Sequence, residues 1–276
     1  IEKVSERKGR DEWKPLWGKR AVVEDHFNEL VIDLVNPAGQ PERMQLVVRG
    51  YNDGFAFCYK IPDGKGPCVN VQSELTAYNF AGDYTAWFYN GENHNIGPEK
   101  LTETDGTRLP VMTVKAGDRH YMAIHEACLE TGAPLVLQSK GGESLFSVAS
   151  KPADLSPGYT SAWRVVLYGT TPGVLTDSHL LELLNPDPDS RYDFSWVKPG
   201  LAVWDWRING AVWDGFTYGM SYPSWVRMVD FAAEQGFKYL VLDANWYGPE
   251  FESDSDPVKG EKAQDVQRLL KYGKEK

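Results

Sequence analysis

Residues 200–206 read Gly-Leu-Ala-Val-Trp-Asp-Trp, and residues 239–250 read Tyr-Leu-Val-Leu-Asp-Ala-Asn-Trp-Tyr-Gly-Pro-Glu. Both are short apolar strands that end in an acidic residue and tryptophan, and a helical segment separates them. This order is typical of the start of a (β/α) barrel, whose active sites lie where the strands end. Six of the chain's ten tryptophans fall between residues 196 and 250. Flat aromatic faces beside carboxylates suit sugar rings, so the stretch predicts a carbohydrate site.

The segment between the two strands carries the start and stop signals of a helix. Ser221 is expected to cap its N-terminus, Pro223 to lie in its first turn and Gly236 to end it. The face expected to be buried carries Val226, Val229 and Ala233. Apolar residues at helical spacing predict a second helix, at Ala263, Val266, Leu269 and Leu270. Two βα units cannot close an eight-stranded barrel, so residues 196–276 are expected to form its N-terminal part only.

Residues 1–170 have the pattern of a β-sandwich. Short strand-like runs recur at a spacing of roughly 8–12 residues. Asn52-Asp53-Gly54 lies between the runs 44–49 and 55–61 and predicts a hairpin turn. Residues 171–195 combine helical spacing over 175–184 with the breaker Asn-Pro-Asp-Pro-Asp at 185–189, which predicts a linker with a short helix. The expected fold class is therefore multidomain, a β-super-sandwich followed by the first two βα units of a (β/α)8 TIM barrel.

Composition excludes several classes of function. The net charge of −10, from 39 acidic and 29 basic residues, argues against nucleic acid as a partner. No run of 18 apolar residues is present, so no membrane span is predicted. The chain opens at Ile1 without an initiator methionine or a signal peptide and is expected to be processed or trimmed. Free buried thiols are favoured for the three cysteines, although a Cys58–Cys68 disulfide across a hairpin stays open.

Five residues at the two strand ends are candidates for binding a sugar. Asp205 and Asp243 suit sugar hydroxyls or acid–base chemistry, and the alternative is a structural carboxylate that accepts hydrogen bonds from loop amides. The indole rings expected to stack on sugars are Trp204, Trp206 and Trp246. As plain core residues they would need partners for their indole N–H groups.

The β region holds one further candidate, Glu126, at the end of an alternating strand. Beside His125 it is a weak signal, because such a pair on a strand is usually structural. The sequence contains no nucleophile elbow, Walker loop or dinucleotide fingerprint.

Seven segments in a fixed order carry a resemblance to a known family. They are Trp-Gly-Lys-Arg at 17–20, Asn-Glu-Leu at 28–30, Arg-Gly-Tyr-Asn-Asp-Gly-Phe-Ala-Phe at 49–57, Ala-Ile-His-Glu-Ala at 123–127, Ser-Trp-Val-Lys-Pro-Gly at 195–200, Val-Asp-Phe-Ala-Ala at 229–233 and Leu-Asp-Ala-Asn-Trp-Tyr-Gly at 242–248. Together they resemble glycoside hydrolase family 97, a family of exo-acting α-glycosidases, over almost the whole chain. The resemblance implies a β-super-sandwich, a helical linker, a catalytic (β/α)8 barrel and a C-terminal β domain.

The resemblance also implies roles for particular residues. Glu126 matches a sandwich glutamate that helps to bind calcium, whose other ligands would come from barrel loops absent here. Asp243 matches a strand-end acid that hydrogen-bonds the sugar, and Trp204 and Trp206 match the aromatic end of the first strand. The residues at 243–250 look more like the retaining α-galactosidase branch than the inverting α-glucosidase branch. The family's general acid and its nucleophile or base lie on later strands, so no catalytic residue is expected in this chain.

The leading hypothesis is the N-terminal part of a retaining, calcium-dependent α-galactosidase or α-glucosidase. Its substrate would be an oligosaccharide or α-glycoside, its partner the remaining barrel and C-terminal domain of the same enzyme, and its location periplasmic or secreted. The alternative hypotheses are a non-catalytic carbohydrate-binding β-sandwich with a vestigial barrel, and a structural fragment whose tryptophans are only core.

Overall fold

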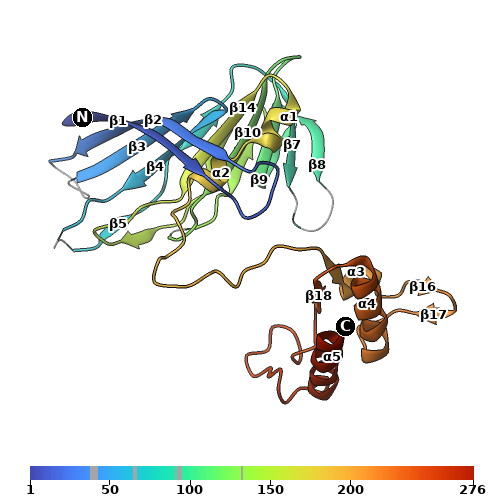
Figure 1. Ribbon diagram of the computed structural model, residues 1–276. Coiled ribbons are helices and arrows are strands. Elements are labelled where there is room, and N and C mark those ends of the chain that lie inside the picture. Colours follow the sequence, from blue (N-terminus) through green and yellow to red (C-terminus); the bar gives the residue numbers. More distant parts are fainter. Residues whose placement is uncertain (38–42, 65–66, 90, 92–94, 132) are drawn as a thin grey trace. The chain divides into compact units, whose positions relative to one another are not determined.

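The chain forms two compact units, Ile1–Asp189 and Ser190–Lys276 (Figure 1). The computed structural model describes residues 1–37, 43–64, 67–89, 91, 95–131 and 133–276. The division between the units falls inside the segment 171–195, for which the sequence predicts a linker. The domain limits 1–170, 171–195 and 196–276 stay a prediction.

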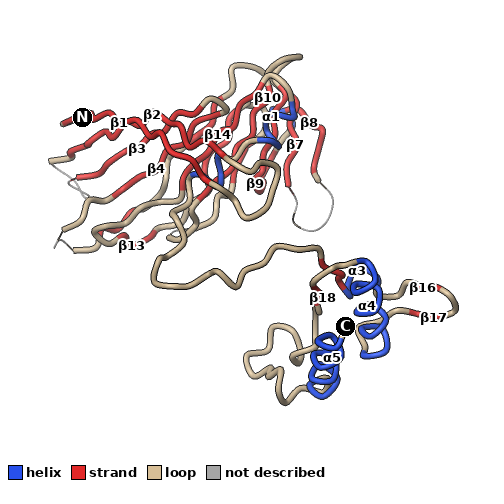
Figure 2. Tube along the Cα trace, viewed as in Figure 1, coloured by secondary structure: helices blue, strands red, loops and turns tan. Residues whose placement is uncertain are grey.

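The first unit is mostly antiparallel β-structure, as the strands in Figure 2 show. Its strands are β1 (Lys3–Trp13), β2 (Val23–Val35), β3 (Arg43–Tyr51), β4 (Gly54–Lys60), β5 (Val69–Val71), β6 (Ala77–Asn79), β7 (Thr85–Tyr89), β8 (Ile96–Lys100), β9 (Asp105–Lys115), β10 (Tyr121–Ala127), β11 (Leu137–Lys140), β12 (Leu145–Val148), β13 (Ala153–Leu155) and β14 (Trp163–Gly169). The pairing order is β1-β2-β3-β4-β14-β10-β9-β11-β12-β6, and β7 pairs with β8 and β9. The long strand β9 pairs with β10 through residues 112–115 and with β11 through residues 105–108. It therefore joins the strands β1–β4, β14 and β10 to the strands β11, β12 and β6.

The central strands β10 and β14 are buried on both faces. Ile124 and Val166 belong to one apolar cluster, while Ala123, Val165 and Leu167 belong to another. Successive residues of a strand point to opposite faces, which explains this division. The near-continuous burial of Trp163–Gly169 follows from its place between two cores. The predicted β-sandwich is thus confirmed.

The hairpin predicted at Asn52-Asp53-Gly54 is present, because Tyr51 pairs with Gly54 across the β3–β4 turn. Gly54 has φ +157°, and a Cβ atom added there would lie 2.4 Å from the carbonyl oxygen of Val166. The close approach of two backbones therefore requires glycine at this position.

Replacing Gly54 with alanine should destabilise the first unit by about 2–3 kcal/mol, because the neighbouring strand must move to admit the methyl group. Chemical denaturation followed by circular dichroism measures the change. Gly50→Ala is the matched control: Gly50 lies in the adjacent strand, and a Cβ there meets nothing within 4 Å. Equal stability of the two variants would contradict the argument.

The helix predicted over 175–184 forms as two short helices. These are α1 (Pro172–Asp177) and α2 (Leu180–Leu183), interrupted at Ser178 and His179. Ser178 adopts an extended backbone, φ −60° and ψ 141°, which ends the first helix. Leu180 and Leu184 pack into the core cluster formed with Val165 and Leu167. The segment therefore covers one face of the sheet.

The second unit alternates strands and helices. Its elements are β15 (Ala202–Trp204), α3 (Asp205–Ile208), β16 (Val212–Trp213), β17 (Phe216–Thr217), α4 (Tyr222–Gln235), β18 (Tyr239–Val241) and α5 (Ala263–Glu275). β15 and β18 pair in parallel, as expected for strands that a helix separates along the chain. The parallel strands and both predicted helices are thus present.

The predicted ends of α4 are confirmed, but its predicted buried face is partly wrong. Ser221 is the N-cap, and Gly236 ends the helix in the left-handed conformation with φ +71°. The buried side chains are Ser224, Trp225, Met228 and Ala232. Val229 packs against the same cluster, whereas Ala233 is exposed. The helix turns toward Trp225 because a buried tryptophan removes far more apolar surface from water than an alanine does.

The cysteines are free thiols, so the alternative Cys58–Cys68 disulfide is not formed. Cys58 is buried, Cys128 is partly buried and Cys68 is exposed. The prediction of buried thiols is therefore correct for Cys58 only. Burial raises the pKa of Cys58 to about 11, so this thiol stays protonated and unreactive near neutral pH. None of the helices in the described residues is long and apolar enough to span a membrane.

Candidate functional site

Trp204 and Asp243 meet at the C-terminal ends of the two parallel strands. Trp204 is the last residue of β15, and Asp243 lies two residues after β18. The indole Nε1 of Trp204 donates a hydrogen bond of 2.6 Å to Oδ2 of Asp243. Asp243 is partly buried and Trp204 is 37% exposed. The pair therefore places a carboxylate and an aromatic ring together at the end of the sheet, and its predicted role in sugar binding stays a prediction.

The buried carboxylate of Asp205 anchors the backbone of Asp243 next to this pair. Its side chain is only 1% exposed. Oδ1 accepts a hydrogen bond of 2.9 Å from the backbone N–H of Asp243, and Oδ2 accepts one of 2.9 Å from Nε1 of Trp225. Both oxygens are thus engaged by protein groups. The structure favours the alternative reading of Asp205, a structural carboxylate that fixes the strand ends, over direct contact with sugar.

Trp206 lies next to this site and is 49% exposed. Arg207, which the sequence analysis did not single out, places its guanidinium 4.8 Å from the centre of the Trp204 ring. A cation over one face of the indole is a favourable contact and fixes the ring's orientation. One face of Trp204 is therefore covered by protein, and sugar stacking would require its other face.

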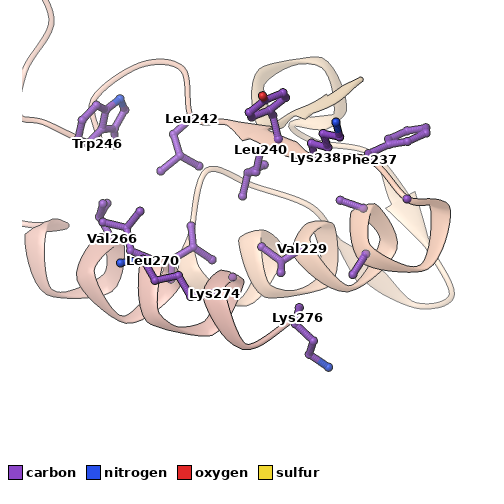
Figure 3. Close-up of a pocket in the computed structure, with 16 residues that line it drawn as sticks. Val229, Phe237, Lys238, Leu240, Leu242, Trp246, Val266, Leu270, Lys274 and Lys276 are labelled. Carbon is purple, nitrogen blue, oxygen red and sulfur yellow. The ribbon is translucent and has the colours of Figure 1, made fainter. Parts of the chain in front are cut away.

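Trp246 packs against the hydrophobic cluster of the second unit. It joins Leu242 and Val266 in the hydrophobic cluster around Trp225, and its ring lies edge-on to Tyr247 with centroids 5.5 Å apart. It lines an apolar groove of about 740 Å³ between α4, α5 and β18. Figure 3 shows Trp246 at one end of the side chains that line this groove. For Trp246 the structure therefore favours a packing role, the other reading of the sequence.

Glu126 lies near the end of β10 and is 7% exposed. Its Oε2 accepts a hydrogen bond of 2.8 Å from the backbone N–H of Leu135 and one of 3.4 Å from Nη1 of Arg164. Arg164 also donates to both oxygens of Glu74, at 2.9 and 2.6 Å. Burial raises the pKa of Glu126, and the Leu135 amide and Arg164 oppose this rise. The sequence alone did not reveal either hydrogen-bond partner of Glu126, because Leu135 and Arg164 both lie outside its strand.

Glu126 is the calcium ligand that the family resemblance implies, and this role stays a prediction. Both of its hydrogen bonds within the described part of the chain end on Oε2, which leaves Oε1 to meet a cation. A ligand oxygen is commonly oriented by hydrogen bonds of this kind. Calcium requires six to eight oxygens. No cluster of three or more potential metal ligands occurs among the described residues, so these residues do not form a calcium site by themselves.

Comparison with known proteins places these features in a family context. The model of the family described as Glycosyl-hydrolase 97 N-terminal matches residues 1–186. A retaining alpha-galactosidase of Bacteroides thetaiotaomicron is 27% identical, over 98% of this chain and 46% of the relative. A probable retaining alpha-galactosidase of Streptomyces bingchenggensis is 32% identical, over 74% of this chain and 32% of the relative. The chain thus spans less than half the length of these relatives.

Solved structures of glycoside hydrolases are also similar to this chain. A glycoside hydrolase family 97 enzyme from Pseudoalteromonas sp. strain K8, in complex with acarbose, matches with a TM-score of 0.79 and 25% identity over 99% of this chain and 44% of that one. A beta-arabinopyranosidase matches with a TM-score of 0.77 and 18% identity over 99% and 45% of the two chains, a likeness of fold alone.

Proposed function

The chain belongs to glycoside hydrolase family 97, and we propose that it is the N-terminal part of a retaining α-glycoside hydrolase. The enzyme would release galactosyl or glucosyl units from the non-reducing ends of oligosaccharides or α-glycosides. The observation that carries the proposal is the hydrogen-bonded pair of Trp204 and Asp243 at neighbouring strand ends. The relatives named retaining alpha-galactosidase support the retaining, galactosyl-specific form of the proposal.

The second unit would be the start of a (β/α)8 barrel. The parallel pairing of β15 and β18, with α4 between them and α5 after them along the chain, supports this assignment. The apolar groove between β18, α4 and α5 offers a surface for the next barrel elements to cover. In this proposal the later strands of the barrel supply the general acid and the nucleophile. A retaining pair of carboxylates stands about 5–5.5 Å apart, so that both reach the same sugar.

Asp243 and Trp204 would bind the terminal sugar ring. Asp243 would accept hydrogen bonds from sugar hydroxyls, since the indole of Trp204 engages only Oδ2. Glu126 would supply one oxygen to calcium through Oε1, and the ion would polarise a sugar oxygen or water. The periplasmic or secreted location stays a prediction.

The test is hydrolysis of a panel of aryl α-glycosides by the product of the complete gene, with calcium present. We expect release of the aryl group with α-galactoside or α-glucoside and with retention of anomeric configuration, which NMR of the first product shows. Residues 1–276 alone should release none. If the complete product hydrolyses no α-glycoside and binds no sugar, the function is wrong; if it binds sugar without hydrolysis, the non-catalytic binding module is favoured.

In the active protein, Asp243→Asn should lower kcat/KM by about 10- to 100-fold, the range expected for one charge-assisted hydrogen bond to the substrate. Steady-state kinetics on the preferred aryl glycoside measures this loss. Asp254→Asn is a suitable control, because Asp254 lies in an exposed loop of the same unit. Equal rates for both variants would exclude Asp243 from the sugar site.

A further inference from the structure

Arg164 lies between two carboxylates but binds them unequally. Its Nε and Nη2 donate to the two oxygens of Glu74 at 2.9 and 2.6 Å, and its Nη1 donates to Oε2 of Glu126 at 3.4 Å. Two parallel N–H···O bonds form the stronger kind of arginine–carboxylate pair, whereas a contact of 3.4 Å is longer than an ordinary hydrogen bond. The charge of Arg164 is therefore balanced mainly by Glu74.

The three side chains are largely shielded from water. Their exposed fractions are 6% for Arg164, 4% for Glu126 and 18% for Glu74. Charges interact more strongly in such surroundings, because little water screens them. Two carboxylates beside one guanidinium leave the group with an excess of one negative charge. Since Glu74 takes up the charge of Arg164, this excess remains on Glu126.

One oxygen of Glu126 stays available to an incoming group. The amide of Leu135, at 2.8 Å, and the guanidinium of Arg164 both donate to Oε2. Oε1 accepts no hydrogen bond from the described residues, and it is not among their fully buried unpaired atoms. This oxygen therefore keeps surface that an ion can reach. Glu74 differs, because Arg164 engages both of its oxygens.

Glu74 is carried by the loop that precedes β6. Its backbone N–H donates to Oγ of Ser150 at 2.7 Å. Two residues later, Oγ1 of Thr76 lies 2.9 Å from the hydroxyl of Tyr59, and the carbonyl of Thr76 accepts a hydrogen bond of 2.9 Å from the N–H of Val148. The loop is therefore anchored to its neighbours, and it holds the Glu74 carboxylate where the guanidinium reaches it.

Removing the charge of Glu74 would free Arg164 to bind Glu126 more closely. Glutamine at position 74 keeps the size of the side chain but not its charge. The guanidinium would then have one carboxylate left, and arginine pairs best with both oxygens of a carboxylate. Oε1 would be covered, and the negative charge of Glu126 would be cancelled. Calcium affinity depends on the number of charged oxygen ligands and on the rigidity of the site, so calcium would bind more weakly.

We propose that Glu74 is a positioning residue for calcium binding: it holds Arg164 away from Oε1 of Glu126 and so keeps this oxygen open and charged. The inference rests on the proposed role of Glu126 as a calcium ligand. Glu74 does not touch the ion, and it acts only through Arg164.

Calcium titration of the product of the complete gene, after a chelator has removed bound metal, tests this role. Isothermal titration calorimetry gives the affinity, and the rise of the melting temperature with added calcium gives a second measure that requires no catalysis. We expect Glu74→Gln to weaken calcium binding about 10- to 100-fold, the range typical for groups that orient a metal ligand. Circular dichroism of the metal-free variant should match that of the parent, because Arg164 keeps Glu126 as a partner.

The variant Glu74→Asp separates charge from shape. Aspartate is shorter but keeps the charge that holds Arg164, whereas glutamine keeps the shape only. We therefore expect Glu74→Asp to bind calcium more tightly than Glu74→Gln, and a purely structural role would give the reverse order. The matched control is Glu99→Gln, since Glu99 is a partly buried carboxylate of the same unit that pairs with Arg108 at 3.2 Å. It should leave the calcium affinity unchanged.

Calcium affinity of Glu74→Gln equal to that of the parent, or a loss no larger than that of Glu99→Gln, would overturn the inference. Tighter binding by Glu74→Gln than by Glu74→Asp would do the same. If the parent binds no calcium, the role of Glu126 as a ligand is wrong as well. Hydrolysis of aryl α-glycosides by the same protein tests the proposed enzymatic function separately, so the two failures are distinguishable.

Discussion

Replacing Arg164 with methionine should lower the free energy of unfolding of the first unit by about 3–5 kcal/mol at pH 7, because a buried ion pair is broken on one side only. Arg164 is 5% exposed and contacts two carboxylates, at 2.6 Å for Glu74 and 3.4 Å for Glu126. Methionine fills much of the same volume but leaves Glu126 buried with only the Leu135 amide as a hydrogen-bond donor. Chemical denaturation measures the stability, and hydrogen exchange across β10 and β14 assigns the loss to this unit.

The deficit of Arg164→Met should shrink as the pH falls. The pKa of Glu126 is already raised by burial, and removal of the guanidinium that lowers it should raise it further. An acid with a higher pKa in the folded state binds more protons when folded, so stability falls as pH rises from its unfolded pKa through its folded pKa. The variant is therefore closest to the parent below the ordinary pKa of glutamate, where both forms are protonated.

Two further variants separate the charge effect from packing. Glu126→Gln combined with Arg164→Met should recover part of the lost stability, because it removes the unpaired charge. Arg119→Met, at an exposed position, should change stability little. If the pH has no influence on the deficit of Arg164→Met, or if Glu126→Gln restores nothing, the loss comes from packing and the ion pair contributes little.

Local sequence signals were sufficient to predict the elements whose conformation depends mainly on a single segment of the chain. The β3–β4 hairpin follows from Asn52-Asp53-Gly54, and α4 starts and ends where Ser221 and Gly236 predict. The parallel pair β15 and β18 follows from two apolar strands separated by a helix. Turn and cap residues act through neighbouring backbone groups, so a single sequence contains the information.

The first strand could not be predicted in this way. β1 reads Lys-Val-Ser-Glu-Arg-Lys-Gly-Arg-Asp-Glu-Trp, which has neither apolar alternation nor β-branched enrichment. Its pairing with β2 and the ion pair of Arg7 with Glu29, at 2.9 Å, hold it in place. These contacts are non-local, and a pattern read along one segment does not contain them.

The candidate site shows the same limit. Alternation along a strand cannot orient Asp205, because β15 ends at Trp204 and the chain turns at once into α3. Trp246 follows Asn245, whose φ of +62° redirects the chain toward the helices. The partner of Glu126 is known only from the β10–β14 register, in which Glu126 lies opposite Arg164. Residue types at the strand ends were therefore predictable, whereas the direction of each side chain required the tertiary structure.

Asp205→Ala should destabilise the second unit by about 3–5 kcal/mol, because two donors lose their acceptor at once. The Trp225 indole is 1% exposed and donates to Oδ2, and the backbone N–H of Asp243 donates to Oδ1. Each buried donor left unpaired costs about 1–3 kcal/mol, more where its partner was charged, and the removed carboxyl group leaves a cavity. Tryptophan fluorescence during urea unfolding and hydrogen exchange in α4 measure the loss.

The graded variant Asp205→Asn tests whether the carboxylate itself is needed. Asparagine keeps one acceptor oxygen but turns an N–H toward the second donor, so it should retain less than half of the lost stability. Because the amide of Asp243 is anchored by Asp205, both variants should also raise the KM of the active protein more than they lower its kcat, through a displaced sugar-binding group. Asp254→Ala, in the exposed loop, is the control. Should Asp205→Ala unfold at the same urea concentration as Asp254→Ala, the hydrogen bonds of Asp205 do not hold the strand ends, and its carboxylate becomes available again as a sugar ligand.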